Sequence, residues 1–270
     1  MSASDVNDSF DWTLRRSYDY LDALTHRDWS WEILRRHEDY QLSWLRSQSA
    51  FEIVPVDAKI SIIRVHTEAP ALTRWGCLYT DIPTADARSA KVFWQPARHS
   101  GVLHMHAIPA SAGLQTGIFN IYDQLSSASL LLMPDGMQHL FLCGEGHRIQ
   151  LAVSGASLLK SVHLLSDSVF GEHETRKHLE TLHQFNSLIA GVHVPVLSAE
   201  RHAARIKFIL QALDGSLAGA SHREIAVALF GPERVDADWN DQGQHLRDRV
   251  RRAINRGRAL MNGGYLRFLR

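Results

Sequence analysis

The hydrophobic residues of this chain change their spacing twice. In Asp11–Ser47, aromatic residues and leucines recur at the three- and four-residue intervals of short helices. From about Glu52 to Ser168 they gather into short apolar runs typical of strands, such as VFW at 92–94 and IQLAV at 149–153. After Gly171 the helical spacing returns. We therefore predict an α+β protein with an N-terminal helical domain (1–60), a central antiparallel β module (61–170) and a C-terminal helical domain with a helix-turn-helix variant (171–270).

Turn-forming residues separate the last apolar runs of the central segment. PDG at 134–136 and GEG at 144–146 are typical of hairpin connections, which predicts an antiparallel meander. Farther along, the pattern predicts one helix over Glu174–Ile189, closed by Gly191, and a second helix that begins near Ser198.

Positive charge is concentrated at the C-terminal end. The whole chain balances 29 basic against 29 acidic residues. From Gln244 to Arg270, however, there are eight arginines and one acid, Asp248, so this segment carries +7 and the rest of the chain −7. A basic segment of this kind indicates a nucleic-acid contact, whereas a solvated charged helix face is the alternative.

The remaining composition limits the cellular setting. Cys77 and Cys143 are the only cysteines, too few for a disulfide framework, and they fit a reducing compartment. The N-terminal residues lack the pattern of a secretory signal, and no apolar run approaches the roughly 18 residues that a spanning helix needs. We expect a cytoplasmic, nucleoid-associated protein without a membrane partner.

A short, well-delimited helix is predicted just after Ser221. Ser221 and Glu224 have the spacing of a capping box, in which each side chain bonds the backbone amide of the other residue. Gly231 and Pro232 end the helix. Its buried stripe is expected to contain Ile225, Ala226, Leu229 and Phe230.

The next long helix, Gln244–Met261, sorts into two faces at 100° per residue. The apolar face contains Leu246, Val250, Ala253, Ile254, Gly257 and Leu260. The other face, which we expect to lack acidic neighbours, contains Arg247, Arg251, Arg252, Asn255 and Arg258. Guanidinium groups on an exposed helix can grip phosphates or the O6/N7 edge of guanine, and an asparagine can pair with adenine.

We predict that Arg247 and Arg251 contact bases and that Arg252 and Arg258 contact the backbone, with Arg223 and His245 as further candidate DNA contacts. The connection Gly231–Gly243 is longer than that of a simple helix-turn-helix. Val235–Trp239 is expected to form an extra turn there, with Trp239 covering the junction.

Two segments resemble a known family. LDGSLAGASHREIAVALFGPERVDADW and LRDRVRRAINRGRALMNGGYLRFL resemble the C-terminal domain of the RovC-like bacterial transcription factors. DWTLRRSYDYLDALTHRDWSWEILRRHEDY resembles the transcriptional regulator-like domain that precedes it in related activators. The resemblance implies a DNA-binding activator of secretion-system or mobile-element transfer genes. Short relatives that act as antiactivators by binding an activator keep a protein-binding role open.

Other chemistries are less well supported by the sequence. His104 and His106 share one face of a predicted strand, but two ligands do not make a metal site. His178 and His183 are five residues apart, which places them on different faces of a helix. No HExxH, phosphate-loop or nucleophile-elbow motif occurs, so we expect no enzyme, metal or cofactor.

The expected partners are double-stranded DNA and a second copy of the chain, since paired half-sites add affinity. RNA polymerase or an antiactivator protein is a further candidate. The N-terminal aromatic residues are interpreted as a small core rather than as base-stacking groups. Trp31 with Arg35 and Arg36 is considered either as a face for another protein or as a basic rim over that core.

Overall fold

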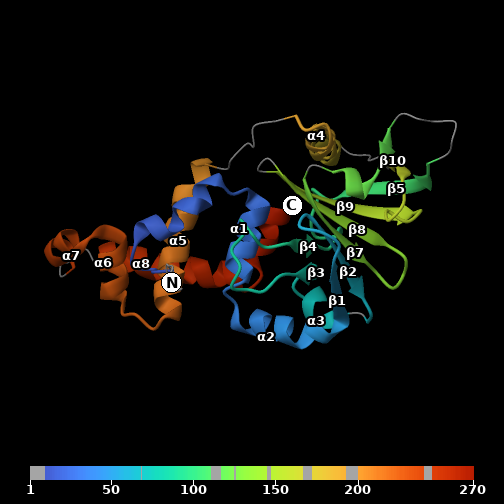
Figure 1. Ribbon diagram of the computed structural model, residues 1–270. Helices are drawn as coiled ribbons and strands as arrows, with labels where there is room; N and C mark the ends of the chain where they lie inside the picture. Colours follow the sequence, from blue (N-terminus) through green and yellow to red (C-terminus); the bar gives the residue numbers. More distant parts are fainter. Residues whose placement is uncertain are drawn as a thin grey trace, which may run out of the picture. The chain divides into compact units, whose positions relative to one another are not determined.

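The chain forms two compact units. The computed structural model describes residues 10–67, 69–110, 117–124, 126–144, 147–166, 172–192, 200–239 and 245–270. One unit, called here the helical unit, combines Met1–Leu34 with Ser198–Tyr265. The other, called the sheet unit, combines Arg35–Leu197 with Leu266–Arg270. In Figure 1 the blue helix α1 of the helical unit accordingly lies beside the orange and red helices α5 and α8.

These units do not coincide with the three consecutive segments expected from the sequence, 1–60, 61–170 and 171–270. The helical unit joins the two ends of the chain because the first helices pack on α5 and α8. The helical segment at the N-terminus is therefore divided between the two units. Its last helix, α2 (Glu38–Ser47), belongs to the sheet unit.

The sheet unit is built on an eight-stranded sheet, with strand order β1-β2-β7-β8-β9-β5-β10-β6. A separate two-stranded sheet pairs β3 with β4. The strands are β1 (Phe51–Pro55), β2 (Ile60–Val65), β3 (Cys77–Thr80), β4 (Val92–Trp94), β5 (Leu103–Pro109), β6 (Ile118–Phe119), β7 (Ser127–Leu132), β8 (Gln138–Gly144), β9 (His147–Gly155) and β10 (Val162–Ser166). The helical elements are α2, η2 (Gln48–Ala50), α3 (Pro70–Thr73), η3 (Ile121–Asp123) and α4 (Glu172–Ile189).

The large sheet is mixed, so the expectation of an antiparallel meander is wrong for part of it. The hairpin predicted at PDG is present, with the Met133 amide donating to the Met137 carbonyl between β7 and β8. Antiparallel β8 and β9 follow, with Gly144 opposite His147, while Glu145 and Gly146 lie outside the described residues. Strands β2 and β7 are parallel, as are β5 and β9. In both pairs a long excursion of the chain separates the strands, and such a crossover allows parallel pairing.

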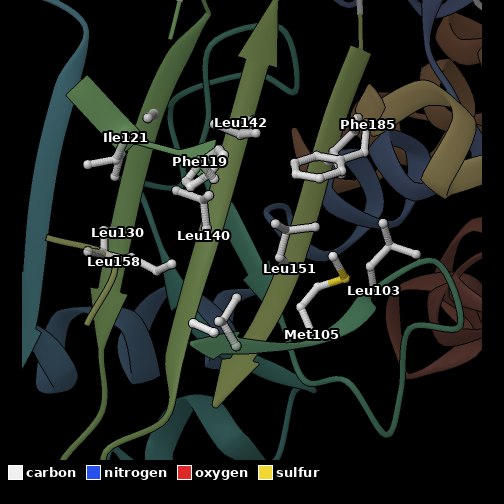
Figure 2. Packing of buried hydrophobic residues seen from close by; sticks show 14 of the residues in the cluster. Leu103, Met105, Phe119, Ile121, Leu130, Leu140, Leu142, Leu151, Leu158 and Phe185 are labelled. Carbon is white, nitrogen blue, oxygen red and sulfur yellow. The ribbon is translucent and has the colours of Figure 1, made fainter. Parts of the chain in front are cut away.

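Apolar side chains cover both faces of this sheet. On one face, leucines of the central strands form a core with Phe185 and Leu188 of α4 (Figure 2). On the other face, Tyr79 and Phe93 of the small sheet pack against Ile63, Leu131 and Phe141. Each fully buried side chain of this size contributes about 1.5–3 kcal/mol.

A buried glutamine also joins the small sheet to the large one. The Gln150 amide accepts from the Trp94 backbone N–H at 2.9 Å and donates to its carbonyl at 2.7 Å. A buried amide is satisfied in this way without water.

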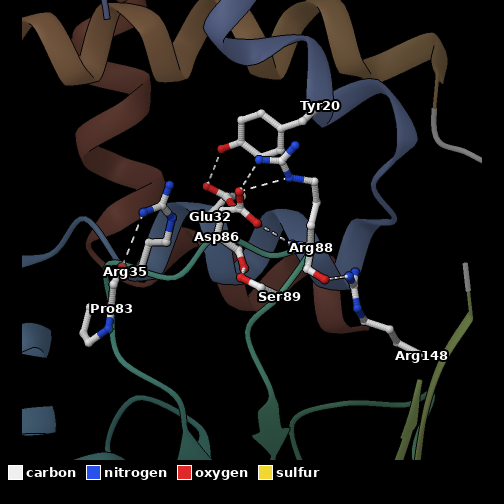
Figure 3. A network of polar contacts seen from close by, with 8 residues as sticks. All are labelled: Tyr20, Glu32, Arg35, Pro83, Asp86, Arg88, Ser89 and Arg148. Atoms are coloured by element: carbon white, nitrogen blue, oxygen red, sulfur yellow. Dashed lines mark hydrogen bonds and ion pairs between the residues drawn. The ribbon is translucent and has the colours of Figure 1, made fainter. Parts of the chain in front are cut away.

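Polar side chains also make hydrogen bonds and ion pairs within each unit (Figure 3). In the sheet unit, the Arg88 guanidinium pairs with Asp86 at 2.6 Å, and Arg148 donates to the Arg88 carbonyl. In the helical unit, the Tyr20 hydroxyl donates to Glu32 at 2.7 Å. Glu32 is fully buried, so this hydrogen bond offsets part of the cost of burying it.

The helical unit is assembled from both ends of the chain. Its elements are η1 (Arg15–Ala23), α1 (His26–Leu34), α5 (Glu200–Leu217), α6 (His222–Phe230), α7 (Pro232–Asp238) and α8 (His245–Met261), and η4 (Gly264–Leu269) follows α8. The Tyr18 hydroxyl donates to Asp214 of α5 at 2.8 Å. Lys207 of α5 pairs with Asp19 at 2.8 Å and also with Asp22. Helix α5 therefore carries the N-terminal segment on one side and packs against α6 and α8.

The aromatic residues near the N-terminus are largely core residues, as predicted. Tyr18, Trp29, Trp31 and Tyr40 are each at most 1 % exposed. The hypothesis that Trp31 is an exposed anchor for a partner is therefore wrong. Helix α1 is buried on every side from Asp28 to Leu34, so this tryptophan has no face toward solvent.

In the part of the chain that the structure describes, no helix has the length and apolar character needed to cross a membrane.

Candidate nucleic-acid interface

Helix α6 begins with the predicted capping box. The Ser221 hydroxyl accepts from the Glu224 amide at 3.3 Å, and the Glu224 carboxylate accepts from the Ser221 amide at 2.7 Å. The hydrogen bond from the Ser221 backbone amide is the main reason why the pKa of the Glu224 carboxyl lies below its usual range, and the bond with the Ser221 side chain lowers it further. Of the expected stripe, Ile225 and Ala226 are buried, whereas Leu229 and Phe230 are half-buried.

A short helix follows α6 where an extra turn was expected. Gly231 ends α6 with φ 87°, a backbone conformation that favours glycine, and Pro232 starts α7. Val235 of α7 is fully buried, and Trp239 packs against the same cluster of α5, α6 and α8 side chains. Trp239 thus covers the junction, as predicted. Residues 240–244, which include the predicted helix start at Gln244, lie outside the described residues.

Helix α8 has the two faces that the sequence predicts. The six expected apolar residues are all buried, from Leu246 to Leu260. All the candidate DNA contacts of α8 are exposed: His245, Arg247, Arg251, Arg252, Asn255 and Arg258. At 1.5 Å per residue, Arg247 and Arg258 are separated by roughly 16 Å along the helix axis. This length is comparable to the major-groove width of about 12 Å, so several side chains of α8 can face one groove.

Close packing holds α8 against α5. A Cβ atom at Gly257 would lie 2.9 Å from the Cβ atom of Leu213 on α5. A similar approach joins α5 to α6, because a Cβ at Gly215 would lie 2.9 Å from Ile225. Carbon atoms normally pack at about 3.5–4.0 Å, so these positions accept only glycine without a shift. The exposed face of α8 is therefore fixed relative to α5 and α6.

Some of these cations already have partners. Arg251 pairs with Asp248 at 3.0 Å, so the expectation of an arginine face without acidic neighbours is wrong at this position. The pair lies one turn apart on α8, a spacing at which side chains meet. Arg223 of α6 pairs with Asp236 of α7 at 2.5 Å. Exposed pairs of this kind contribute at most about 1 kcal/mol, so a phosphate can displace the carboxylate.

Arg247 and Arg258 are positioned by neighbouring side chains. The Arg247 guanidinium lies 5.1 Å from the centre of the Trp239 ring, within the range of a cation–π contact. Arg258 donates to the Ser216 hydroxyl of α5 at 3.0 Å. Both contacts limit the rotamers of long side chains and so reduce the entropy that binding would cost.

Sequence reasoning assigned no role to Arg249, which the structure places on the side of α8 toward α5 and α6. Its guanidinium lies 4.7 Å from the Phe230 ring and 5.7 Å from the Phe208 ring. The sequence shows Phe208 and Phe230 as possible ring partners for an arginine. It does not show that they lie beside Arg249, because that depends on how α5, α6 and α8 pack.

The histidines that the sequence singled out lie on β5 and α4. His104 and His106 share the exposed face of β5, as predicted, and His106 Nδ1 is 2.9 Å from the Ser154 hydroxyl. His178 of α4 lies 2.8 Å from the Ser166 hydroxyl. Within the described ranges, no group of three or more histidine, cysteine or acidic side chains is arranged to hold a metal ion.

Comparison with known protein families matches both ends of the chain. Residues 169–270 match the family model described as "T6SS, Transcription factor, DNA binding domain". Residues 11–79 match the model described as "Proteobacterial transcriptional regulator-like domain". A search of curated proteins found no match. The exposed basic helix and these two matches define a DNA-binding transcriptional regulator. Residues 169–270 and 11–79 thus match the two domain families that the sequence was found to resemble, which confirms that resemblance for these segments.

Proposed function

We propose that this protein is a sequence-specific DNA-binding regulator in which α6, α7 and α8 form a helix-turn-helix variant and α8 enters the major groove. The observation that carries the proposal is the arginine face of α8. It is exposed along the whole helix, while the opposite face is buried against α5 and α6. A recognition helix needs this combination of a fixed backbone and exposed side chains that donate hydrogen bonds.

The arrangement supports a division of roles along α8. Arg247 and Arg251 lie one turn apart near the start of the helix, the end that usually meets base edges, and are proposed to read guanine. Arg252 and Arg258 are proposed to grip phosphates, and Asn255 to contact adenine or the backbone. Among the flanking candidates, His245 lies at the exposed start of α8 and Arg223 on α6. Both are proposed as peripheral contacts.

The matched family model supports a proposal for the biological role. The matched C-terminal model describes a type VI secretion (T6SS) transcription factor domain. We propose that the protein activates secretion-system or mobile-element transfer genes, without enzymatic activity or cofactor, at the nucleoid in the cytoplasm. Binding as a homo-oligomer to paired half-sites would supply affinity that a single helix lacks. RNA polymerase, or an antiactivator protein, is the proposed protein partner.

The test uses the full chain and begins with genomic footprinting of the tagged protein in its host to find the operator. Affinity for that operator is then measured by fluorescence anisotropy at two or more salt concentrations. The Arg247→Ala, Arg251→Ala double variant is compared with Arg176→Ala, a control that removes an exposed arginine of α4, which pairs with Glu180 in the same helix.

Each lost phosphate contact should flatten the slope of log K against log salt by about 0.9. Each lost guanine contact should cost about 1–3 kcal/mol at one operator position and relax specificity there. Arg176→Ala should leave both unchanged. Operator affinity that is unchanged in the double variant, with the melting temperature preserved, would refute the role of α8 and favour the alternative, an interaction module that docks on another regulator.

A further inference from the structure

A separate pocket in the helical unit is lined by cations and aromatic rings. Its volume is about 360 Å³, and none of the candidate DNA contacts named above lines it. Five elements of the unit, η1, α5, α6, α7 and α8, supply the lining: Arg15, Ala204, Lys207, Phe208, Gln211, Leu229, Phe230, Arg234 and Arg249. The volume is at the lower end of the roughly 300–1,000 Å³ range of small-molecule sites.

The charge of this pocket is one-sided. Four basic side chains line it, and among the residues that the structure describes no carboxylate does. Lys207 is bound to Asp19 and Asp22, and Arg234 is 3.7 Å from Asp238 at an exposed edge. Arg15 and Arg249 add positive charge beyond these pairs. Bringing like charges together around one small space is unfavourable unless an anion occupies it.

The aromatic rings give the pocket a second property. Phe208 and Phe230 have their centroids 5.7 Å apart, and the Arg249 guanidinium lies over both. The Arg234 guanidinium lies 5.8 Å from the Phe230 ring. A guanidinium stacked on a ring keeps its N–H edge available for a phosphate, because the ring occupies only its face. Phe208, Phe230 and Leu229 leave an apolar wall against which a flat ring can pack.

We propose that this pocket binds a nucleoside monophosphate, in which a sugar joins a planar base to one phosphate group. The guanidinium groups of Arg249, Arg234 and Arg15 supply charge-assisted hydrogen bonds to the phosphate. The base packs against the apolar wall formed by Phe208, Phe230 and Leu229. A ligand of this size fits the volume of the pocket, and its phosphate group would neutralise part of the positive charge of the lining. Because the lining comes from five elements, the bound nucleotide would also stabilise the helical unit.

The test is isothermal titration calorimetry with the full-length protein, together with its melting temperature. The probes are AMP, GMP, CMP and UMP, with the matching nucleosides and inorganic phosphate for comparison. At least one nucleoside monophosphate is expected to bind and to raise the melting temperature. Its nucleoside and inorganic phosphate should each bind at least ~10-fold more weakly, because the nucleoside lacks the phosphate group and inorganic phosphate lacks the base.

Arg249→Gln and Arg15→Gln should each weaken nucleotide binding at least ~10-fold, the loss typical of one charge-assisted hydrogen bond. Arg15→Gln tests the pocket without disturbing the stacked rings, in case the Arg249 variant unfolds. Arg176→Gln is the matched control on α4 and should bind normally.

Failure of all four nucleotides to bind at millimolar concentration would overturn the proposal. So would binding that survives both pocket variants. If the Arg15 and Arg249 variants weaken binding of duplex DNA while no mononucleotide binds, the pocket is a phosphate contact of the DNA interface and the proposal is wrong.

Discussion

Replacing Gly257 with alanine should destabilise the helical unit, although the same change at an exposed helical position is stabilising. The new methyl group would lie 2.9 Å from Cβ and 3.4 Å from Cδ1 of Leu213, and 3.4 Å from the Ile209 carbonyl oxygen. Leu213 is fully buried, so it has no free space into which to move. Helices α5 and α8 would have to separate locally by about 0.6 Å or more to restore an ordinary carbon–carbon contact.

Two opposing contributions set the size of the effect. Removing a glycine from a helix interior stabilises by about 1 kcal/mol. Overpacking a well-packed site costs about 1–3 kcal/mol. The difference predicts a net loss of roughly 0–2 kcal/mol, opposite in sign to the helix propensity.

The measurement is urea unfolding of the full chain, followed by circular dichroism at 222 nm. The matched control is Ala259→Gly, two residues farther along α8 at an exposed position. Propensity alone should make this control about 1 kcal/mol less stable. If Gly257→Ala instead stabilises by about the same amount, α5 and α8 are not in close contact and their assignment as a fixed support for the arginine face is refuted.

Three further predictions concern α6. Ala226 is fully buried between the helices of the unit, so Ala226→Glu should place a charge in the core. It should cost about 3–5 kcal/mol of folding free energy and abolish the circular dichroism signal of the unit's helices. If the variant keeps both this signal and DNA binding, Ala226 is wrongly assigned to the buried face of α6. Ser221→Ala removes the N-cap and should cost about 1 kcal/mol in urea unfolding at pH 7, and no change would argue against the capping box. The capping box also predicts a pH dependence, because its hydrogen bonds lower the pKa of Glu224. A lowered carboxyl pKa stabilises the fold above the unfolded value of about 4.3, and this stability is lost as the pH falls through the folded value. The stability difference between the wild type and Glu224→Gln should therefore shrink as the pH falls, and a difference that stays constant from neutral pH into acid would contradict it.

The features that sequence predicted well are local. Every residue assigned to the apolar face of α8 is buried, since a helical period of 3.6 places such residues on one side whatever the partner. The capping box of α6 is equally local, because Ser221 and Glu224 are three residues apart. The hairpin at residues 134–136 depends only on a tight turn between neighbouring strands.

The features that sequence did not predict depend on contacts between distant residues. Ile60 pairs in parallel with Ala128, and nothing in either segment specifies a partner so far along the chain. Trp31 was considered as an exposed anchor, because a helix pattern does not reveal that other elements cover every side of it. The cationic pocket was missed for the same reason, since Arg15 and Arg249 line the same pocket only when the two segments of the helical unit fold together.

The discontinuous helical unit has a consequence for the timing of biosynthesis. The hydrogen bond between Tyr18 and Asp214 cannot form until Asp214, 196 residues farther along the chain, has been synthesised. At a translation rate of about 5–20 residues per second, this delay is roughly 10–40 s. During that time the Arg35–Leu197 part of the sheet unit can fold on the ribosome, while the first helices emerge without their partner α5. A nascent chain is thus unable to complete the packing of its first helices with α5 and α8 before α8 itself has been translated.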